Sequence, residues 1–274
     1  MEKLTYIAEG DALPRSVKEY LLSLGFSVTL IKSVKYGGIL LNGSRVNTNA
    51  TVRCGDEICI LMPDEASENI EPMNIPLKVV YEDEYLLAVD KPTNMPTHPS
   101  KGNNLPTLAN AVMGMYGGNF VFRAITRLDR DTSGLVLIAK DRISAYRLSE
   151  DMKSGKIKKE YRALVRGVPN TKEGSIDAPI RRVAEGDIRR GVFADGKSAL
   201  TDYRVVEIIG DNALCEINLH TGRTHQIRVH MAHIGHPLIG DFLYGSRDDG
   251  DYHLRCFRLS FLHPKSRERI VLEI

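Results

Sequence analysis

Short apolar runs follow one another along most of the chain, and irregular loops rather than regularly placed helices separate them. Strands are expected at 77–81, 85–89, 135–139, 161–165, 201–208, 213–219 and 270–274. Helices are expected between them only at 105–116, 143–152 and 224–234. A parallel sheet needs a crossover, usually a helix, between successive strands, and that regular alternation is missing. The pattern therefore favours an α+β domain built on a central mixed, mostly antiparallel sheet.

The first 62 residues are organised differently. Apolar residues recur at helical spacing over 14–24 and 28–36, which predicts two short helices. Short strands are then expected at 39–41, from Val46 and at 58–62, with tight turns at Asn42-Gly43 and Gly55-Asp56. The acidic, proline-bearing stretch 63–76 is expected to link this small α+β module (1–62) to the larger domain (77–274).

Composition narrows the class of protein. The hydrophobic fraction is 42%, yet no apolar run approaches the roughly 20 residues that span a bilayer. The N-terminus lacks the apolar core of a signal peptide. The four cysteines show no CxxC spacing, so reduced thiols are expected rather than a zinc site. We therefore expect a cytoplasmic protein with no membrane partner.

Basic residues gather locally although the net charge is only +2. Residues 140–166 hold nine Lys and Arg against four Asp and Glu, and residues 13–62 hold six against three. Cations concentrated on selected faces suit a protein that contacts a polyanion. Ordinary solvated surface charge is an equally good explanation of this distribution alone.

The loop before one expected strand carries two carboxylates, Asp129 and Asp131. In an extended backbone both side chains share one face. The pair can act as nucleophile and general acid at a glycosidic carbon. Alternatively, one is catalytic and the other caps the turn Thr132-Ser133-Gly134. A third interpretation is that both form surface ion pairs with Arg127 and Arg130.

Five of the eight histidines fall within residues 219–245. His230 and His233 lie one helical turn apart, but Asp241 is the only acid there that could support a metal ligand. Packing, capping or RNA contact is therefore favoured over a metal site. Arg223 begins the expected helix, where its guanidinium can clamp a carboxylate or a phosphate at two points.

Tyr161 lies among cations in the segment KKEYR. A tyrosine in that setting can stack on a base while its neighbours meet phosphate. It can equally fill the core of the sheet.

Several segments together resemble the RluA family of pseudouridine synthases over nearly the whole chain. TRLDRDTSGLVLIAK is similar to the family's HRLDxxTSG segment, and YEDEYLLAVDKP and KKEYRALVRG are similar to its Lys-Pro loop and tyrosine segment. The remaining matches follow in order: GKSALTDYRVVE, TGRTHQIRVHMAHIGHPLIGDFLYG and RLSFLHP. Residues 13–62 resemble the S4 RNA-binding module that many members carry in front.

The resemblance implies a role for individual residues. Asp129 matches the nucleophilic aspartate, so Asp131 does not. Arg127 matches the arginine that enters the RNA stack when the target uridine flips out. Tyr161 matches the tyrosine that packs on the uracil and takes part in proton transfer at C5. Arg223 matches the arginine that ion-pairs the catalytic aspartate. Phosphate contacts of the S4-like module are expected from Arg15, Lys18, Lys32, Lys35 and Arg45.

Two positions depart from the family pattern. Thr126 stands where histidine usually precedes Arg-Leu-Asp, and Pro92-Thr93-Asn94 lacks the glycine that commonly follows Lys-Pro. Both are interpreted as loop variation that alters substrate fit without removing activity.

The expected activity is conversion of uridine to pseudouridine in structured RNA, by a monomer. This isomerisation transfers no electrons overall, so no redox cofactor and no metal is expected. Large-subunit ribosomal RNA is the leading substrate and tRNA the second. A non-catalytic RNA-binding or ribosome-assembly factor is the rival from another class, and a glycosidase acting on free sugars is a distant third.

Overall fold

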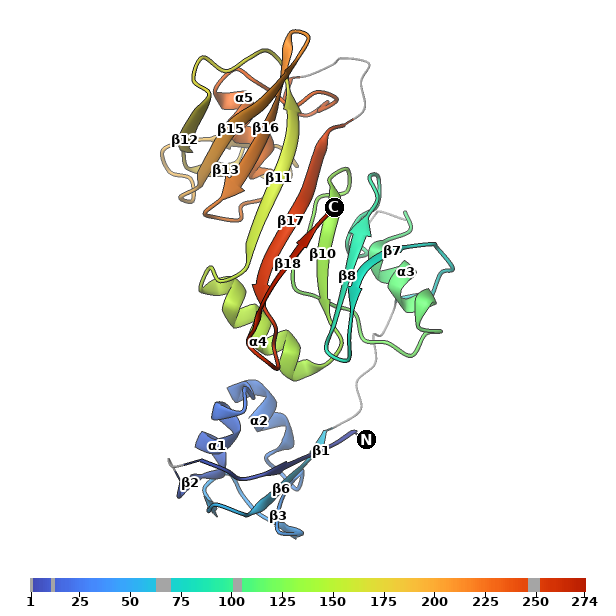
Figure 1. The fold of residues 1–274 in the computed structure, drawn as a ribbon, viewed down its shortest axis with the longest axis vertical. Coiled ribbons are helices and arrows are strands. Elements are labelled where there is room, and N and C mark those ends of the chain that lie inside the picture. Colours follow the sequence, from blue (N-terminus) through green and yellow to red (C-terminus); the bar gives the residue numbers. More distant parts are fainter. Residues whose placement is uncertain (1, 11–12, 63–69, 101–104, 246–251) are drawn as a thin grey trace.

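The computed structural model describes residues 2–10, 13–62, 70–100, 105–245 and 252–274. Within these ranges, one large hydrophobic cluster lies in the first 62 residues and a larger one spans residues 86–261. Figure 1 shows the first part, here called the N-terminal module (2–62), at one end of an elongated molecule. The second part, here called the C-terminal domain (70–274), contains the long central sheet.

Two helices and short strands form the N-terminal module. The helices are α1 (Val17–Ser23) and α2 (Val28–Val34). Its main sheet has the order β1-β6-β3-β4, formed by Glu2–Ile7, Glu57–Met62, Ile39–Leu41 and Ser44–Arg45. A second pair joins β2 (Arg15–Ser16) and β5 (Thr51–Val52). The two helices and the strands β3 and β6 lie where the sequence predicts them. The strands β1, β2 and β5 were not predicted, and the return strand expected from Val46 is instead β4, which ends at Arg45.

Local sequence signals set the ends of these elements. Ser16 caps α1 in a reciprocal capping box with Glu19, and Ser27 caps α2. Asn42 and Gly43 have φ angles of 49° and 80°, as the predicted tight turn requires. The Asn42 side chain also donates to Asp56 at 2.8 Å, so the two predicted turns support each other.

A ten-stranded sheet forms the centre of the C-terminal domain. Its order is β12-β15-β16-β11-β17-β10-β8-β7, with β18 added to β17 and β9 added to β10. The pairing between β10 and β17 is parallel, and the other pairings among the described strands of this sheet are antiparallel. The predicted mixed, mostly antiparallel sheet of an α+β domain is therefore confirmed.

The seven strands expected in this domain are all present near their predicted positions. The strands are Lys78–Glu82 (β7), Leu86–Lys91 (β8), Arg123–Ala124 (β9), Ser133–Ala139 (β10), Lys158–Val165 (β11), Glu173–Asp177 (β12), Leu200–Ile209 (β15), Asn212–Leu219 (β16), Leu254–Leu262 (β17) and Arg269–Glu273 (β18). A separate hairpin joins β13 (Ile180–Arg182) and β14 (Arg190–Val192). The strands β9, β12, β13, β14 and β17 were not predicted, and of these β17 lies at the centre of the sheet.

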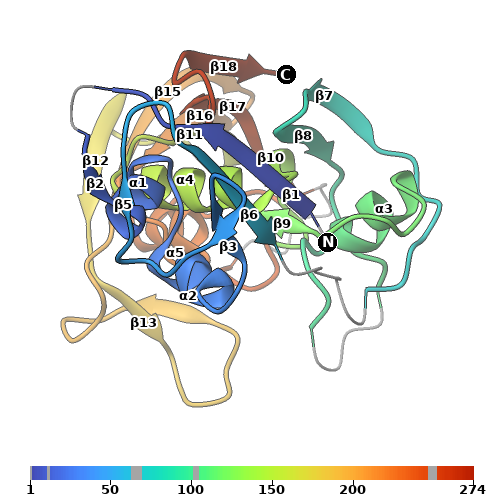
Figure 2. The same ribbon diagram turned by 90° about the horizontal axis from the view of Figure 1, so that it is seen from below.

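Three helices accompany the sheet in the described part of this domain. They are α3 (Leu108–Met115), α4 (Arg142–Lys153) and α5 (Gln226–His233). The helix α4 crosses the end of the sheet nearest the N-terminal module, and α5 lies at the other end behind β15 and β16 (Figure 1). In Figure 2 the β13 region projects to one side of the molecule and α3 lies at the other. None of the helices among the described residues is long and apolar enough to cross a membrane.

The expected linker is only partly described. Residues 63–69 lie outside the described residues. Residues 70–76 have no regular secondary structure, but Met73 donates its N–H to the Asn110 carbonyl at 3.0 Å, and the Asn110 amide donates to the Glu71 carbonyl at 2.8 Å. This half of the stretch is therefore packed on α3. The module itself contacts α4, where Arg147 donates to the carbonyls of Leu24 and Pro264.

Candidate active site

A cavity of about 340 Å³ opens where the loop before β10, the strand β11 and the start of α5 meet. It has both polar and apolar walls, as sites that bind a planar polar ligand generally do. Its lining includes Arg127, Asp129, Thr132, Lys159, Tyr161, Leu219, Arg223, His225, Arg228 and Leu254. The four cavity residues singled out from the sequence, Arg127, Asp129, Tyr161 and Arg223, thus line one space.

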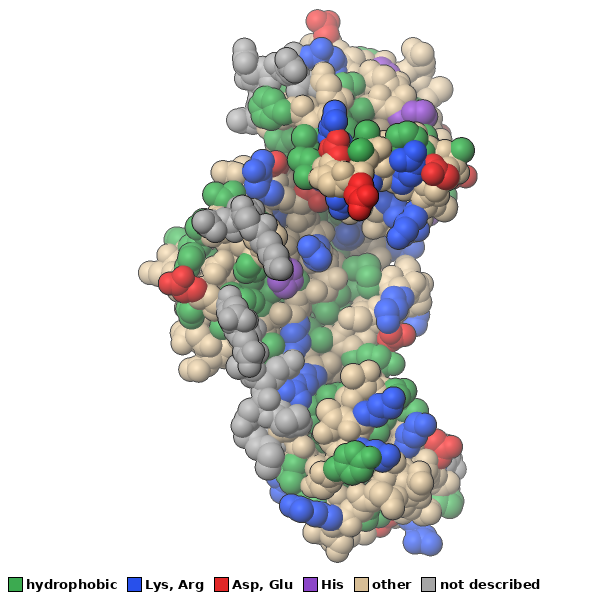
Figure 3. Space-filling model, turned by 180° about the vertical axis from the view of Figure 1, so that it is seen from behind, with side chains coloured by type: hydrophobic (Ala, Val, Ile, Leu, Met, Phe, Trp, Pro, Cys, Tyr) green, Lys and Arg blue, Asp and Glu red, His purple; other side chains and the backbone are tan. Residues whose placement is uncertain are grey.

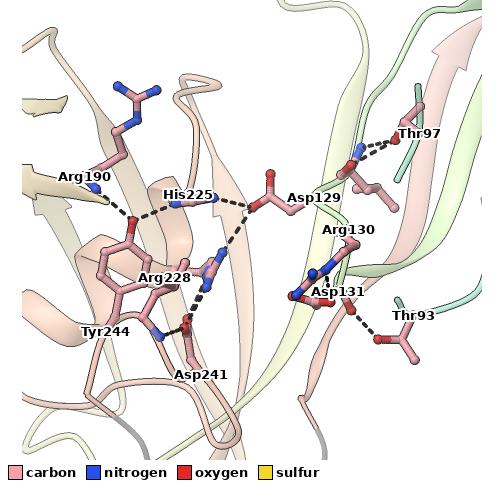
Figure 4. A network of polar contacts seen from close by, with 12 residues as sticks. Thr93, Thr97, Asp129, Arg130, Asp131, Arg190, His225, Arg228, Asp241 and Tyr244 are labelled. Carbon is pink, nitrogen blue, oxygen red and sulfur yellow. Dashed lines mark hydrogen bonds and ion pairs between the residues drawn. The ribbon is translucent and has the colours of Figure 1, made fainter. Parts of the chain in front are cut away.

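Backbone contacts with the Lys-Pro loop hold the Asp129 loop in place. The buried Lys91 ammonium donates to the carbonyls of Pro92 (2.9 Å), Met95 (2.7 Å) and Arg130 (3.0 Å). Figure 4 shows Thr97 and Thr93 making further links. The Thr97 hydroxyl donates to the Leu128 carbonyl at 2.9 Å, and the Thr93 hydroxyl donates to that of Asp131 at 2.7 Å. Residues on both sides of Asp129 are therefore fixed from one neighbouring loop.

Replacing Lys91 with methionine should loosen this support. Burial lowers the pKa of Lys91 to about 8, while the three carbonyl acceptors favour the ammonium form. Methionine has similar length but leaves buried carbonyls without their donor, so Lys91→Met should lower the free energy of unfolding by about 1–3 kcal/mol. Urea denaturation measures this change.

The control is Lys78→Met on the neighbouring strand β7, where the side chain is 70% exposed. Its effect should stay within about 0.5 kcal/mol. Equal stability changes for the two variants would contradict the structural role given to Lys91.

The two departures from the family pattern have structural explanations. Asn94 has a φ of 55°, a left-handed conformation that asparagine adopts more readily than most residues other than glycine. Thr126 is 1% exposed, and its hydroxyl accepts a hydrogen bond from the Leu137 N–H at 2.9 Å. Thr126 therefore supports β10 and is not among the residues that line the cavity.

Gly134 explains part of the Thr-Ser-Gly segment. Ser133 and Gly134 begin β10 instead of forming a separate turn. Gly134 has a φ of 111°, and a Cβ there would lie 2.2 Å from the carbonyl oxygen of Cys256. Glycine therefore permits the close parallel pairing of β10 with β17, which begins at Ser133, directly after Thr132.

The structure separates the two carboxylates. Asp131 forms a two-point ion pair with Arg130, at 2.8 and 3.0 Å. The Asp129 side chain instead lines the cavity and is 34% exposed. Its Oδ2 lies 3.9 Å from both His225 Nε2 and Arg228 Nη1. The surface-pair interpretation thus describes Asp131, whereas Asp129 faces the cavity.

The expected ion pair between Arg223 and Asp129 is replaced by one from Arg228. Arg223 is exposed and donates from Nε to the Ser198 carbonyl at 2.9 Å. Arg228 lies five residues further on, in the first turn of α5, and is buried because it pairs with buried Asp241 at 2.7 Å through both Nε and Nη2. Its remaining nitrogen faces Asp129 (Figure 4). The isolated acid Asp241 was the sequence signal for this buried partner.

A chain of polar groups also leads to Asp129 on the same side as Arg228 (Figure 4). The backbone N–H of Arg190 donates to the Tyr244 oxygen at 2.9 Å, and that oxygen lies 2.6 Å from His225 Nδ1. If the Tyr244 hydroxyl donates to Nδ1, the His225 proton stands on Nε2, which faces Asp129. Burial lowers the pKa of His225, so the neutral ring with this tautomer suits an ionised Asp129.

Tyr161 forms another wall of the cavity. It is 4% exposed on β11, and burial raises the pKa of Tyr161 well above its ordinary value. The side chain is therefore a neutral phenol near neutral pH. Lys159, two residues earlier on the same strand, also lines the cavity and was named from the sequence only as a possible phosphate contact.

The fully buried histidine of the cluster, His230, forms hydrogen bonds that stabilise the fold. His230 is fully buried and its two ring nitrogens lie 2.9 Å from the Thr201 hydroxyl and 2.8 Å from the Ala178 carbonyl. Among the described residues, no group of three or more His, Cys, Asp and Glu side chains is arranged to hold a metal ion.

Cations of the N-terminal module lie apart from this cavity. Lys18, Lys32, Lys35 and Arg45 are exposed and Arg15 is partly exposed. Tyr36, 89% exposed, lies beside Lys35, whose Nζ is 5.2 Å from the ring centroid. Figure 3 shows basic side chains over this face of the module and of the C-terminal domain.

Comparison with known proteins assigns the chain to a family. The sequence model of a family described as RNA pseudouridylate synthase matches residues 85–233, which hold Asp129, Tyr161 and Arg228. The chain belongs to this family. It is therefore an RNA pseudouridine synthase, an isomerase, and the resemblance of its catalytic segments is confirmed. The resemblance of residues 13–62 to an S4 module stays a prediction.

Individual relatives cover most of this RNA pseudouridine synthase. It is 38% identical over 263 residues to the uncharacterized RNA pseudouridine synthase YjbO of Bacillus subtilis (strain 168), across 93% of each chain. It is 41% identical over 211 residues to ribosomal large subunit pseudouridine synthase D of Pasteurella multocida (strain Pm70), across 76% of this chain and 65% of that one. The solved structure of human RNA pseudouridylate synthase domain containing 1 is 28% identical, with a TM-score of 0.62, across 73% and 83%.

Proposed function

We propose that this enzyme isomerises uridines of large-subunit ribosomal RNA and that Asp129 is its nucleophile. The observation that carries the role of Asp129 is that its carboxylate lines the same cavity as the buried Tyr161. The other carboxylate, Asp131, is paired with Arg130. Support for the substrate comes from relatives named ribosomal large subunit pseudouridine synthase D at 41% and 40% identity.

The chemistry needs an ionised carboxylate next to the ribose. Asp129 attacks C1′ or removes the C2′ proton, and both routes break the bond from C1′ to N1 of the base. Arg228 places a positive charge beside this carboxylate, at 3.9 Å. The neutral Tyr161 phenol offers a flat surface on which the freed uracil turns before C5 bonds to C1′. As a neutral phenol it suits holding the base better than removing the C5 proton.

The target base must leave its stack to reach this cavity, at a cost of a few kcal/mol. Arg127 is exposed and lines the cavity, so its guanidinium is available to occupy the vacated position in the RNA. The S4-like N-terminal module adds phosphate contacts away from the cavity through its exposed lysines and arginines.

Tritium release tests the substrate. Transcripts of large-subunit ribosomal RNA and of tRNA, both labelled with 5-tritiated uridine, are incubated with the enzyme, because each conversion releases the tritium at C5. Release from the ribosomal transcript, mapped to specific uridines, is the expected result. Release from tRNA alone would favour the tRNA alternative, and binding of RNA without release from any RNA would favour a non-catalytic assembly factor.

The module's phosphate contacts predict a change in salt dependence. Lys32→Gln and Lys35→Gln should each reduce the slope of log affinity against log salt by about 1 and weaken binding to all sequences similarly. Filter binding at several salt concentrations measures the slope. Lys172→Gln, at an exposed lysine of the C-terminal domain, is the control. A slope reduced equally by Lys172→Gln would count against a special role for the module.

A further inference from the structure

Lys91 and Lys159 of the C-terminal domain differ in whether their ammonium groups form hydrogen bonds with the protein. The three N–H donors of Lys91 all reach backbone carbonyls. Lys159 is partly buried, yet within the described part of the chain its ammonium makes no hydrogen bond and no ion pair. An ammonium has three donors and no acceptor, and removing it from water without partners is unfavourable. The Lys159 ammonium can therefore donate hydrogen bonds to a bound ligand.

The position of Lys159 shows where that partner lies. Side chains two residues apart on a strand point to the same face, so Lys159 and Tyr161 face the cavity together while Lys158 is exposed. The Lys159 Nζ lies 5.7 Å from the centroid of the Tyr161 ring. Asp129 lines the same cavity and is among the groups that act on the Lys159 charge.

A base rather than a phosphate fits this location. A phosphate next to an ionised Asp129 would be repelled, and exposed Arg127 at the same cavity is better placed for the RNA backbone. Apolar Leu219 and Leu254 complete the walls around Lys159. A uracil ring fits this combination, because its flat faces can pack against the leucines and a carbonyl oxygen at its edge can accept a hydrogen bond from the ammonium.

We propose that the Lys159 ammonium donates a hydrogen bond to a carbonyl oxygen of the target uracil and stabilises the negative charge of the detached base. The inference rests on the proposed role of Asp129. When the N1–C1′ bond breaks, its electron pair stays with the uracil and spreads over N1, O2 and O4. When C5 then bonds to C1′, the ester bond from C1′ to Asp129 breaks, or on the glycal route C2′ takes its proton back from Asp129, and the base becomes neutral. The C5 proton then passes to water and N1 takes a proton from water, which gives the pseudouridine base. Lys159 acts most strongly while the base is an anion, which makes it a catalytic residue.

Single-turnover kinetics test this role. The probe is total RNA labelled with 5-tritiated uridine from cells that lack the gene, so natural targets are present whichever RNA contains them. With enzyme in excess, Lys159→Met should lower the limiting rate of tritium release about 10²-fold, the usual effect of losing one preorganised donor. The enzyme concentration at half-maximal rate should change little. Lys159→Arg, which keeps the charge and the donors, should recover at least about tenfold of that loss.

The controls separate this inference from the other assignments. Lys158→Met, the exposed neighbour, should react like wild type, and thermal denaturation checks that each variant is folded. A normal limiting rate for folded Lys159→Met overturns the inference, as does a weaker affinity with a smaller salt slope, which indicates a phosphate contact. Failure of Lys159→Arg to exceed Lys159→Met also overturns it, because a proton acceptor is then required. The proposed role of Asp129 is tested separately: if the Asp129→Asn enzyme is active, that role is wrong whatever the Lys159 variants show.

Discussion

Asp129→Asn should bind RNA as tightly as the wild-type enzyme and release tritium from 5-tritiated uridine at least about 10³-fold more slowly. The substitution preserves the size of the side chain but removes the negative charge that either chemical route requires. Loss of a nucleophile has effects of this size or larger in other enzymes. Asp129 forms no short hydrogen bond in the described structure, and its nearest charged partners stand at 3.9 Å, so folding should be little affected.

Asp131→Asn is the matched control, because it makes the same chemical change two residues away. Asp131 is paired with Arg130 and does not line the cavity. The limiting rate should therefore stay within about threefold of wild type, with a stability loss of at most about 1 kcal/mol from the exposed ion pair. Comparable turnover by Asp129→Asn, or an equal loss in Asp131→Asn, would refute the assignment of Asp129.

Local signals explain what the sequence predicted well. The caps Ser16 and Thr107 satisfy N–H groups at their own helix ends, and Asn42-Gly43 closes its own turn. Each of these features depends on residues close together in the chain, so each is visible without knowing the fold. The mixed, mostly antiparallel sheet followed from the spacing of strands for the same reason.

The missed features depend on contacts between distant residues. The strand β17 alternates buried and partly exposed residues except at Cys256 and Phe257, which are adjacent and both buried, and its arginines at 255 and 258 are partly exposed. Those arginines are supported by Asp90 and Glu160 on other strands, which the sequence alone does not place. The residue types around Asp129 and Asp131 did not distinguish the two carboxylates. The family resemblance favoured Asp129, and the structure shows that only Asp129 lines the cavity whereas Asp131 is paired with Arg130.

The sequence predicted Arg223 instead of Arg228 as the partner of Asp129 for the same reason, because the difference depends on a contact between residues distant in the chain. Arg223 follows a turn and precedes a helix, which are the local features of an exposed clamp, and the structure shows it exposed. Arg228 is buried only because Asp241, thirteen residues further on, is folded against it. A buried arginine with a two-point carboxylate partner can hold its third nitrogen toward a catalytic carboxylate, and an exposed arginine is less well held.

Arg228→Met should be the most destabilising substitution in the site. Asp241 has 0% side-chain exposure and would lose its counterion, keeping only the N–H of Leu243 at 3.1 Å. Removing one partner of a buried ion pair generally costs about 3–5 kcal/mol, since the other charge stays buried. The limiting rate should also fall by about 10²-fold or more, because Asp129 loses the cation beside it. Urea denaturation and single-turnover tritium release measure the two effects.

A double variant separates these two effects of Arg228. In Arg228→Met/Asp241→Leu no buried charge is left unpaired, so stability should return to within about 1–2 kcal/mol of wild type. The rate of tritium release should stay as low as in Arg228→Met, because restored packing does not return a cation to Asp129. If stability and turnover recover together, Arg228 acts only through the fold; if turnover stays low in a stable protein, the charge beside Asp129 serves the reaction itself.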